Sequence, residues 1–430
     1  MKGNGAAANG LAVVDVDGHL CEPEALWDRY VERDYRPLAR AALWRGVDDE
    51  GNRVTVLNGA PVRDLNRSRL DRLAIWRPGL RPEDIGALDP NAFHPPNPGG
   101  SDPEARLADM DAMGVGQAVL FPTLFSEHLP LVANPDAAAV LARAYNDWAR
   151  DFASSSPERL FPVAVLPLQS PLHARRELER VARDGFRAVC LRPMFYDVPV
   201  IEPAGAGQAR AGEGSVYFSV RPPRGVFLNH PHFRPLWERI ARLDLVACVH
   251  PSLGIANPEP TSAGSYIERV AERLGLGHTV AEPTACLQDN GLFLVAACFQ
   301  GLLEDLPRLR LALCHAGASW LPLALEKAET FLWLEIPGVF GRRTRPVSLE
   351  PAEVARAHPL VVSFDSWESS VAAMPDLFET QAAWSSRYPQ HDASAPAEAL
   401  ATLGRHGVPD AIVERLMGQN ARALFRLPSP

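Results

Sequence analysis

The sequence is poor in the features that mark secreted, membrane-bound and nucleic-acid-binding proteins. It has six cysteines in 430 residues, with no Cys-x-x-Cys pair and no regular spacing. Three of them lie in apolar stretches typical of buried strands, which predicts reduced, packed thiols in a cytoplasmic protein rather than a disulfide framework. The segment after Met1 has no apolar signal-peptide core, and no apolar run approaches the ~18 residues of a membrane span. The net charge of -9 at pH 7 disfavours a nucleic-acid or anionic membrane surface as partner.

Several common catalytic motifs are missing as well. The chain has no Gly-rich phosphate loop, no Ser-His-Asp arrangement, no zinc-ribbon spacing and no internal repeat. We therefore predict no cofactor-binding residues of the nucleotide type. Hydrophobic residues make up 47% and charged residues 22% of the chain, which is ordinary for a globular protein with a sizeable core.

Short apolar runs alternate with longer helical patterns, which is typical of an α/β protein with a parallel sheet or barrel. We predict one (β/α)8 TIM-barrel domain over residues 1–430, with a doubly wound open sheet as the alternative. The eight predicted strands are Ala12–Val16, Gln117–Phe121, Phe161–Leu166, Arg187–Leu191, Leu245–Val249, Arg310–Cys314, Leu360–Phe364 and Gln381–Ser385. Predicted helices include Asp136–Ala153, after a cap at Asn134, and Phe233–Leu243, Trp320–Leu334 and Asp410–Phe425.

Three long insertions interrupt this pattern, at about 48–100, 196–228 and 252–280. The first contains the pair Asn58-Gly59, which predicts a hairpin turn. The second is rich in glycine and proline, and the third is a long loop. They follow the first, fourth and fifth predicted strands. Loops after barrel strands lie on the C-terminal face, so we expect these insertions to wall a deep pocket there.

Polar side chains stand at the ends of three predicted strands. Asp17 and His19 alternate along the first strand and so face the same way. His250 and His315 are each the first residue after an apolar strand. A single histidine in such a place is more often a hydrogen-bonded structural group, but four groups converging on one rim are hard to explain by packing. We therefore predict a divalent-metal site at the barrel mouth.

Six segments of the chain, three of which contain the residues just named, resemble segments of a known family and occur in the same order. They are Asp15–His19 with Glu22–Trp27, Arg106–Gly114, Pro235–Ile240, Val249–Pro251, Leu306–Pro322 and Gly418–Phe425. Together they resemble the amidohydrolase-2 branch of the amidohydrolase superfamily over essentially the whole chain. The resemblance implies a distorted (β/α)8 barrel with one or two divalent metals, in enzymes that hydrolyse or decarboxylate small acids.

The chain departs from the family at the end of the eighth strand. The family's aspartate there binds metal and shuttles the proton of the attacking water, whereas Arg387 stands at the matching position. A guanidinium neither ligates a cation nor acts as a base near neutral pH. Asp365 belongs to the seventh strand by its spacing and is a weaker candidate ligand. Glu22 could reach a second metal or simply brace its loop, and His391 with Asp392 could form a shifted ligand set or a surface pair.

Loss of that aspartate makes the chain resemble the superfamily's non-heme diiron monooxygenases. On this hypothesis Asp17, His19, His250 and His315, helped by Glu22 and His391, hold two iron ions that activate dioxygen. The enzyme would hydroxylate a small natural-product intermediate of secondary metabolism, terpenoid-like and linked to coenzyme A. A basic loop at 341–346 could grip the phosphates of such an acyl-CoA substrate, although a solvated loop is the simpler interpretation.

The alternative is a mononuclear zinc or manganese hydrolase or decarboxylase. His315 would then be the catalytic residue for proton transfer, Arg387 would bind a substrate carboxylate, and Arg192 would orient a carbonyl or carboxylate. A third hypothesis is a metal-free binding protein on a decayed barrel. A homo-oligomer is compatible with all three.

Overall fold

The structure is a computed structural model. It describes residues 11–47, 53–63, 73–89, 92, 94–196, 225–228, 231–251, 278–333 and 350–429. The loop 341–346 and most of the insertions predicted at 196–228 and 252–280 therefore lie outside the described residues.

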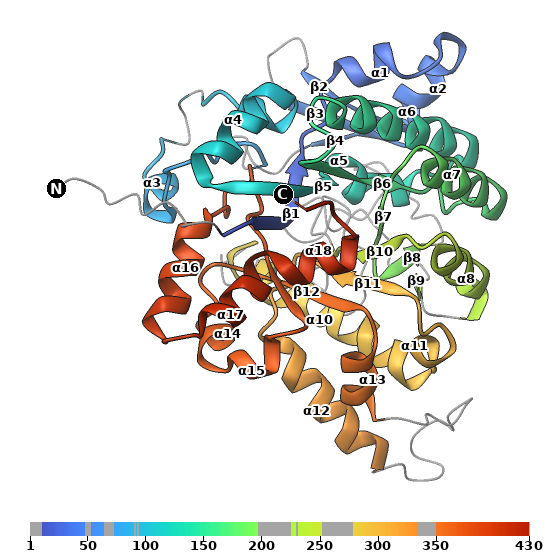
Figure 1. The fold of residues 1–430 in the computed structure, drawn as a ribbon. Coiled ribbons are helices and arrows are strands. Elements are labelled where there is room, and N and C mark those ends of the chain that lie inside the picture. Colours follow the sequence, from blue (N-terminus) through green and yellow to red (C-terminus); the bar gives the residue numbers. More distant parts are fainter. Residues whose placement is uncertain are drawn as a thin grey trace.

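Eight parallel strands form a distorted (β/α)8 barrel, as the sequence predicts (Figure 1). Their order around the sheet is β1-β5-β6-β7-β10-β11-β12-β13, which follows the chain. The strands are β1 (Val13–Leu20), β5 (Val115–Pro122), β6 (Leu160–Val165), β7 (Ala188–Leu191), β10 (Val246–Val249), β11 (Arg310–Leu313), β12 (Leu360–Phe364) and β13 (Ala382–Trp384). Each overlaps a predicted strand, because continuous apolar runs suit strands that are covered on both faces.

Helices surround the barrel, as Figure 1 shows. Many of them have a proline in the first turn, which is a common start signal. Asn134 caps α6 through its side chain, which accepts from the backbone N–H groups of Asp136 and Ala137. The helices are α1 (Ala25–Arg29), α2 (Arg36–Ala42), α3 (Pro82–Gly86), α4 (Pro103–Met113), α5 (Leu124–His128), α6 (Pro135–Ala153), α7 (Pro171–Arg183), α8 (Arg234–Arg242), α10 (His278–Phe299), α11 (Leu302–Asp305), α12 (Trp320–Trp333), α13 (Pro351–Ala357), α14 (Ser369–Ala373), α15 (Pro375–Phe378), α16 (Pro396–Arg405), α17 (Asp410–Glu414) and α18 (Asn420–Phe425). No described helix is both long and apolar enough to cross a membrane.

Two small antiparallel sheets lie outside the barrel. One consists of β2 (Leu43–Val47), β3 (Arg53–Leu57) and β4 (Ala60–Arg63), and the other pairs β8 (Met194–Tyr196) with β9 (Gly225–Phe227). The predicted hairpin turn joins β3 to β4, with positive φ angles of 52° at Asn58 and 80° at Gly59. Asparagine and glycine tolerate that backbone conformation, which explains why this pair stands at the turn.

The barrel closes where the segment after β13 meets β1, and we call this junction the seam. The backbone N–H of Arg387 donates to the carbonyl of Asp17 over 3.0 Å, and that of His19 donates to Tyr388 over 2.6 Å. The buried carboxylate of Asp15 accepts hydrogen bonds from the backbone N–H and the hydroxyl of Ser386. Polar contacts to β1 thus complete the barrel beside the predicted site.

Candidate metal centre

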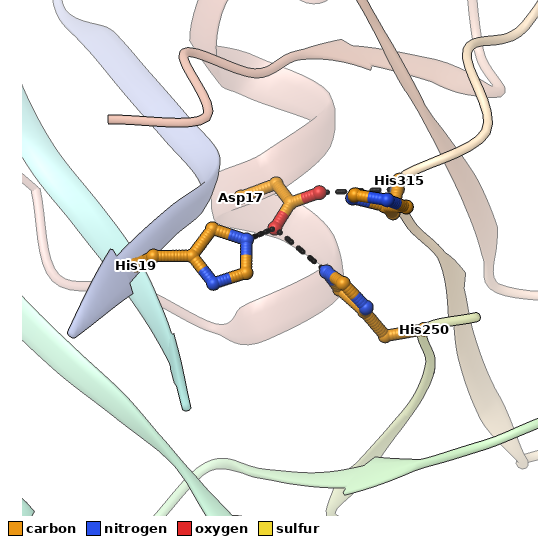
Figure 2. Close-up of side chains that lie close together, drawn as sticks. All are labelled: Asp17, His19, His250 and His315. Carbon is orange, nitrogen blue, oxygen red and sulfur yellow. Dashed lines mark hydrogen bonds and ion pairs between the residues drawn. The ribbon is translucent and has the colours of Figure 1, made fainter. Parts of the chain in front are cut away.

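Asp17, His19, His250 and His315 meet at one point of the barrel mouth (Figure 2). Each offers a ligand atom, and these atoms all lie within 4.8 Å of one another. Asp17 and His19 point inward from β1, while His250 follows β10 and His315 lies just beyond β11. The strand alternation and strand-end positions that motivated the prediction therefore bring all four side chains together.

Asp17 lies at the centre of this cluster. Its Oδ1 atom is 3.4 Å from Nε2 of His19 and 3.4 Å from Nε2 of His250. Its Oδ2 atom accepts a hydrogen bond of 3.0 Å from the backbone N–H of His315. Asp17, His19 and His250 are at most 2% exposed. Within the described part of the chain, Oδ1 of Asp17 and the two Nε2 atoms are buried without a hydrogen-bond partner.

The Nδ1 atoms of His19 and His250 explain why the Nε2 atoms of these rings face Asp17 without a hydrogen bond. Nδ1 of His250 lies 2.8 Å from the carbonyl oxygen of Pro251, and Nδ1 of His19 lies 3.3 Å from that of Pro122. A carbonyl only accepts, so each Nδ1 carries the proton and donates it. In the neutral ring, Nε2 then presents a lone pair toward Asp17. Metal-binding histidines are commonly oriented in this way, because a hydrogen bond from one ring nitrogen to a nearby acceptor turns the other nitrogen toward the metal.

The electrostatics favour the protonation states that a cation needs. Burial by itself would raise the pKa of Asp17, but His250 and His19 outweigh that effect and hold its pKa well below the usual range. Burial lowers the pKa of His19. Burial and then the charge of Arg387 lower the pKa of His315 to well below its ordinary value. The carboxylate of Asp17 is therefore ionised, and the lowered pKa values of His19 and His315 favour their neutral forms.

These residues fit a divalent metal. Three buried polar atoms face one another, and none of them has a hydrogen-bond partner among the described residues, which is unfavourable unless a cation lies among them. Two imidazoles and one carboxylate suit manganese, zinc or iron alike. The ligand roles of Asp17, His19 and His250 remain predictions that this geometry supports.

His315 differs from the other two histidines because Arg387 contacts its ring. The Nη1 atom of Arg387 donates a hydrogen bond to Nδ1 of His315. Arg387 also lies 2.7 Å from Oδ2 of Asp392 through Nε, and donates from Nη2 to Oε1 of Gln390 over 3.0 Å. The arginine that replaces the family's aspartate is thus held against the cluster. Its predicted role in substrate binding stays a prediction.

Glu22 is not brought to the cluster. Its carboxylate accepts hydrogen bonds from the backbone N–H groups of Thr123, Leu124 and Phe125, at 3.0, 2.9 and 3.3 Å. These groups begin α5, so the carboxylate caps that helix, a role that neither of the two interpretations of the sequence included. The sequence offered no way to see this contact, because about a hundred residues separate Glu22 from α5.

The remaining candidates lie around the rim. His391 is 3.9 Å from Asp392 and about a third exposed, and neither belongs to the metal cluster. Arg192 is buried after β7 and donates to the carbonyl of Glu127 over 3.0 Å. Asp365 follows β12, where burial and the charge of Glu368 raise its pKa to about 7. Among these, Asp365 is the carboxyl that retains a proton near neutral pH.

Sequence reasoning missed Arg106, which lies in a segment noted only for its family resemblance. Its side chain is 1% exposed and lies 4.0 Å above the ring of Tyr388. It donates from Nε to the carbonyl of Gly99 over 2.8 Å and from Nη2 to that of His19. Arg106 therefore fixes the backbone that carries His19. Its place as a charged residue in the first turn of α4 gave no signal of this burial.

Comparison with known proteins places this geometry in context. A family model described as Amidohydrolase matches residues 92–427. A gamma-resorcylate decarboxylase of Rhizobium sp. (strain MTP-10005) is 26% identical over 246 residues, and the alignment covers 56% of this chain but only 64% of that relative.

Solved structures share the fold over nearly the full length. An amidohydrolase from Mycobacterium avium subsp. paratuberculosis K-10 has a TM-score of 0.68 and 17% identity, covering 97% of this chain and 99% of its own. A 5-carboxyvanillate decarboxylase from Novosphingobium aromaticivorans, with bound manganese and 3-methoxy-4-hydroxy-5-nitrobenzoic acid, has a TM-score of 0.64 and 18% identity, covering 98% and 99%. At this identity the similarity shows the shared fold.

The expectation of a diiron monooxygenase is wrong. The curated relative and one of the two similar structures are decarboxylases, and the bound ion that is named is manganese, so iron, dioxygen and hydroxylation find no support. The error has a chemical cause. Replacing the family's aspartate by Arg387 removes the base that activates water, but decarboxylation breaks a carbon–carbon bond and needs no activated water. The loss of hydrolytic machinery therefore did not require oxygen chemistry. The acyl-CoA substrate is not supported either.

Proposed function

This chain belongs to the amidohydrolase family, and from that premise we propose that it is a metal-dependent decarboxylase of a small aromatic carboxylic acid. Manganese is the first candidate for its metal and zinc the second. This was the alternative to the oxygenase in the sequence interpretation. This chain aligns with only 64% of the length of the decarboxylase relative, so the aromatic substrate class belongs to the proposal and is not taken from the comparison.

The convergence of Oδ1 of Asp17 with Nε2 of His19 and of His250 is the observation that carries this proposal. These are three buried atoms with lone pairs and, in the described structure, no proton donor. They would hold the metal. When bound, the ion supplies a Lewis acid that fixes the anionic oxygen atoms of the substrate.

Arg387 would face the substrate carboxylate from the β13 side. One N–H on each of its terminal nitrogens is used by His315 and Gln390, and each of these nitrogens carries a second N–H. A guanidinium binds a carboxylate well through two such donors. Because Asp392 and Gln390 hold the arginine in place, it can orient the carboxylate without the entropy cost of a free side chain.

Decarboxylation also needs a proton at the ring carbon. The bond between ring carbon and carboxylate breaks, carbon dioxide leaves, and the electron pair stays on the ring carbon and takes up the proton. Burial and the charge of Arg387 lower the pKa of His315, which makes it a weaker acid for this step, and its catalytic role stays a prediction from the sequence. We propose that Asp365 supplies the proton, because it directly follows β12, lies within the electrostatic reach of Arg387 and Asp17, and has a pKa raised to about 7 by burial and by Glu368. Water then restores the proton on Asp365.

The test is release of carbon dioxide by purified protein loaded with manganese. Gamma-resorcylate and 5-carboxyvanillate are the first substrates to offer, with ring-hydroxylated benzoates to follow. We expect turnover with at least one acid, abolished by chelation and absent in Asp17→Asn. Absence of carbon dioxide release from every acid, by protein that demonstrably holds manganese, would rule the proposal out.

A further inference from the structure

His315 and Arg387 face each other in an unusual way. Both have left-handed backbone conformations, with φ of 64° and 59°, and neither is a glycine. Non-glycine residues adopt this conformation at a cost and persist in it where the surroundings impose it. A hydrogen bond runs from Nη1 of Arg387 to Nδ1 of His315. A guanidinium has donors only, so Nδ1 must be the acceptor in this bond.

Both partners are fixed by further contacts. The backbone N–H of His315 donates to Oδ2 of Asp17 over 3.0 Å and to Oγ of Ser363 over 3.1 Å. Arg387 is 8% exposed, and its backbone N–H donates to the carbonyl of Asp17 over 3.0 Å. Its Nε, 2.7 Å from Oδ2 of Asp392, fixes the far side of the guanidinium. The two side chains therefore cannot exchange this contact for another without moving the loops that carry them.

The tautomer of His315 is then opposite to that of its neighbours. In His19 and His250 a carbonyl accepts from Nδ1, which leaves the lone pair on Nε2. In His315 the lone pair of Nδ1 is used by Arg387, so the neutral ring carries its proton on Nε2. Neither nitrogen of His315 has a lone pair to offer to a metal.

We propose that Arg387 is a positioning residue that holds His315 as an Nε2–H donor and keeps it out of the coordination sphere. The metal is then bound by Asp17, His19 and His250 alone. This inference rests on the metal-binding part of the proposed function and extends it. Three protein ligands leave positions open for the oxygen atoms of the substrate, and Nε2–H of His315 can donate to one of them.

Metal titration separates ligands from their neighbours. Manganese binding is measured by electron paramagnetic resonance on the full chain and on His250→Ala, His315→Gln and Arg387→Met. Glutamine can still accept from Arg387 through its carbonyl oxygen and donate through its amide, so His315→Gln should fold. We expect His250→Ala to weaken binding at least 100-fold, as expected when a ligand is removed, and His315→Gln to change it by less than threefold. An equal loss in these two variants would overturn the inference.

Nitrogen-15 spectra of histidine-labelled, metal-free protein test the tautomer directly. The signals of His315 are identified by their disappearance in His315→Gln. We expect a protonated Nε2 and an unprotonated Nδ1 in the full chain, and loss of this single tautomer in Arg387→Met. A protonated Nδ1 in the full chain would overturn the inference. Because this measurement needs neither metal nor turnover, it decides the question even if the protein binds no manganese or decarboxylates no acid.

Discussion

Oδ1 of Asp17 lies 3.4 Å from Nε2 of His250, and neither atom has a hydrogen-bond partner within the described ranges. An ordinary hydrogen bond between these atoms would be shorter, and the Nδ1–H bond of His250 to Pro251 has already placed the ring proton on the other side. Two lone pairs thus face each other in a buried site. A divalent cation between them turns this repulsion into binding energy.

Manganese should therefore stabilise the folded protein. A ligand that binds only the native state adds about 2.7 kcal/mol when its concentration is 100 times its dissociation constant. We expect thermal unfolding to shift upward with manganese in the full chain and to stay unchanged in Asp17→Asn. His173→Ala, which removes a partly exposed histidine paired with Asp136 on the surface, serves as control and should respond like the full chain. A manganese-dependent shift in Asp17→Asn would contradict the ligand assignment.

Glu22→Ala separates the capping role of this residue from a ligand role. Three backbone N–H groups at the start of α5 lose their acceptor, which should destabilise the protein by about 2–3 kcal/mol in urea unfolding. Manganese affinity should stay within a few-fold of the full chain. Glu24→Ala, at an exposed position two residues away, should leave both quantities unchanged. A drop in manganese affinity matching that of His250→Ala would restore Glu22 as a ligand.

The hydrogen bonds at the seam predict that alanine substitutions of two neighbouring buried serines lower the free energy of unfolding by unequal amounts. The hydroxyl of Ser386 donates to Asp15 and accepts from the backbone N–H of Tyr388, whereas that of Ser385 donates only to the carbonyl of Phe364. Ser386→Ala should lower the free energy of unfolding by about 2–3 kcal/mol, because the buried carboxylate of Asp15 loses a hydrogen-bond donor. Ser385→Ala should cost about 1 kcal/mol. Equal free energies of unfolding in the two variants would show that the bonds to Asp15 do not stabilise the seam.

The pKa of Asp365 predicts a stability change with a definite sign. Burial and Glu368 raise its pKa to about 7 in the folded state, against about 3.9 in an unfolded chain. Arg387, Asp392 and Asp17 are the other charges acting on it. The folded state binds the proton more tightly, so stability falls as the pH rises from about 4 to about 7 and is constant above that.

Asp365→Asn removes this penalty. The metal-free variant should be more stable than the parent by about 4 kcal/mol at pH 8, with the difference shrinking as the pH falls toward 5. Asp392→Asn is the matched control with the opposite sign, since Arg387 lowers the pKa of Asp392 and the variant loses an ion pair. A stability difference for Asp365→Asn that does not change with pH would contradict the raised pKa.

The barrel and the core of the site could be predicted because both depend on local patterns. Short apolar runs, most of them continuous, marked the eight barrel strands, and a period of two placed Asp17 and His19 on the same side of β1. His250 and His315 were found because each comes just after an apolar strand. The carboxyl ends of all barrel strands lie at one rim, so residues at these ends are expected to come together.

The contacts that determine the chemistry of the site could not be predicted from the sequence. They depend on how side chains from distant segments of the chain are oriented toward one another. The bond from Arg387 to His315 needs two left-handed residues 72 positions apart. The capping by Glu22 needs α5 to begin beside β1, and the burial of Arg106 needs the ring of Tyr388 beneath it. The reaction was misjudged for a related reason. The loss of one aspartate shows which base is missing, but it does not show which reaction remains.

Closure of the barrel and the candidate cation site share one stretch of backbone. The bonds from Arg387 to Asp17 and from His19 to Tyr388 join the segment after β13 to the strand that carries two of the proposed ligands. A substitution that loosens this junction should therefore lower both the stability of the fold and the affinity for a cation.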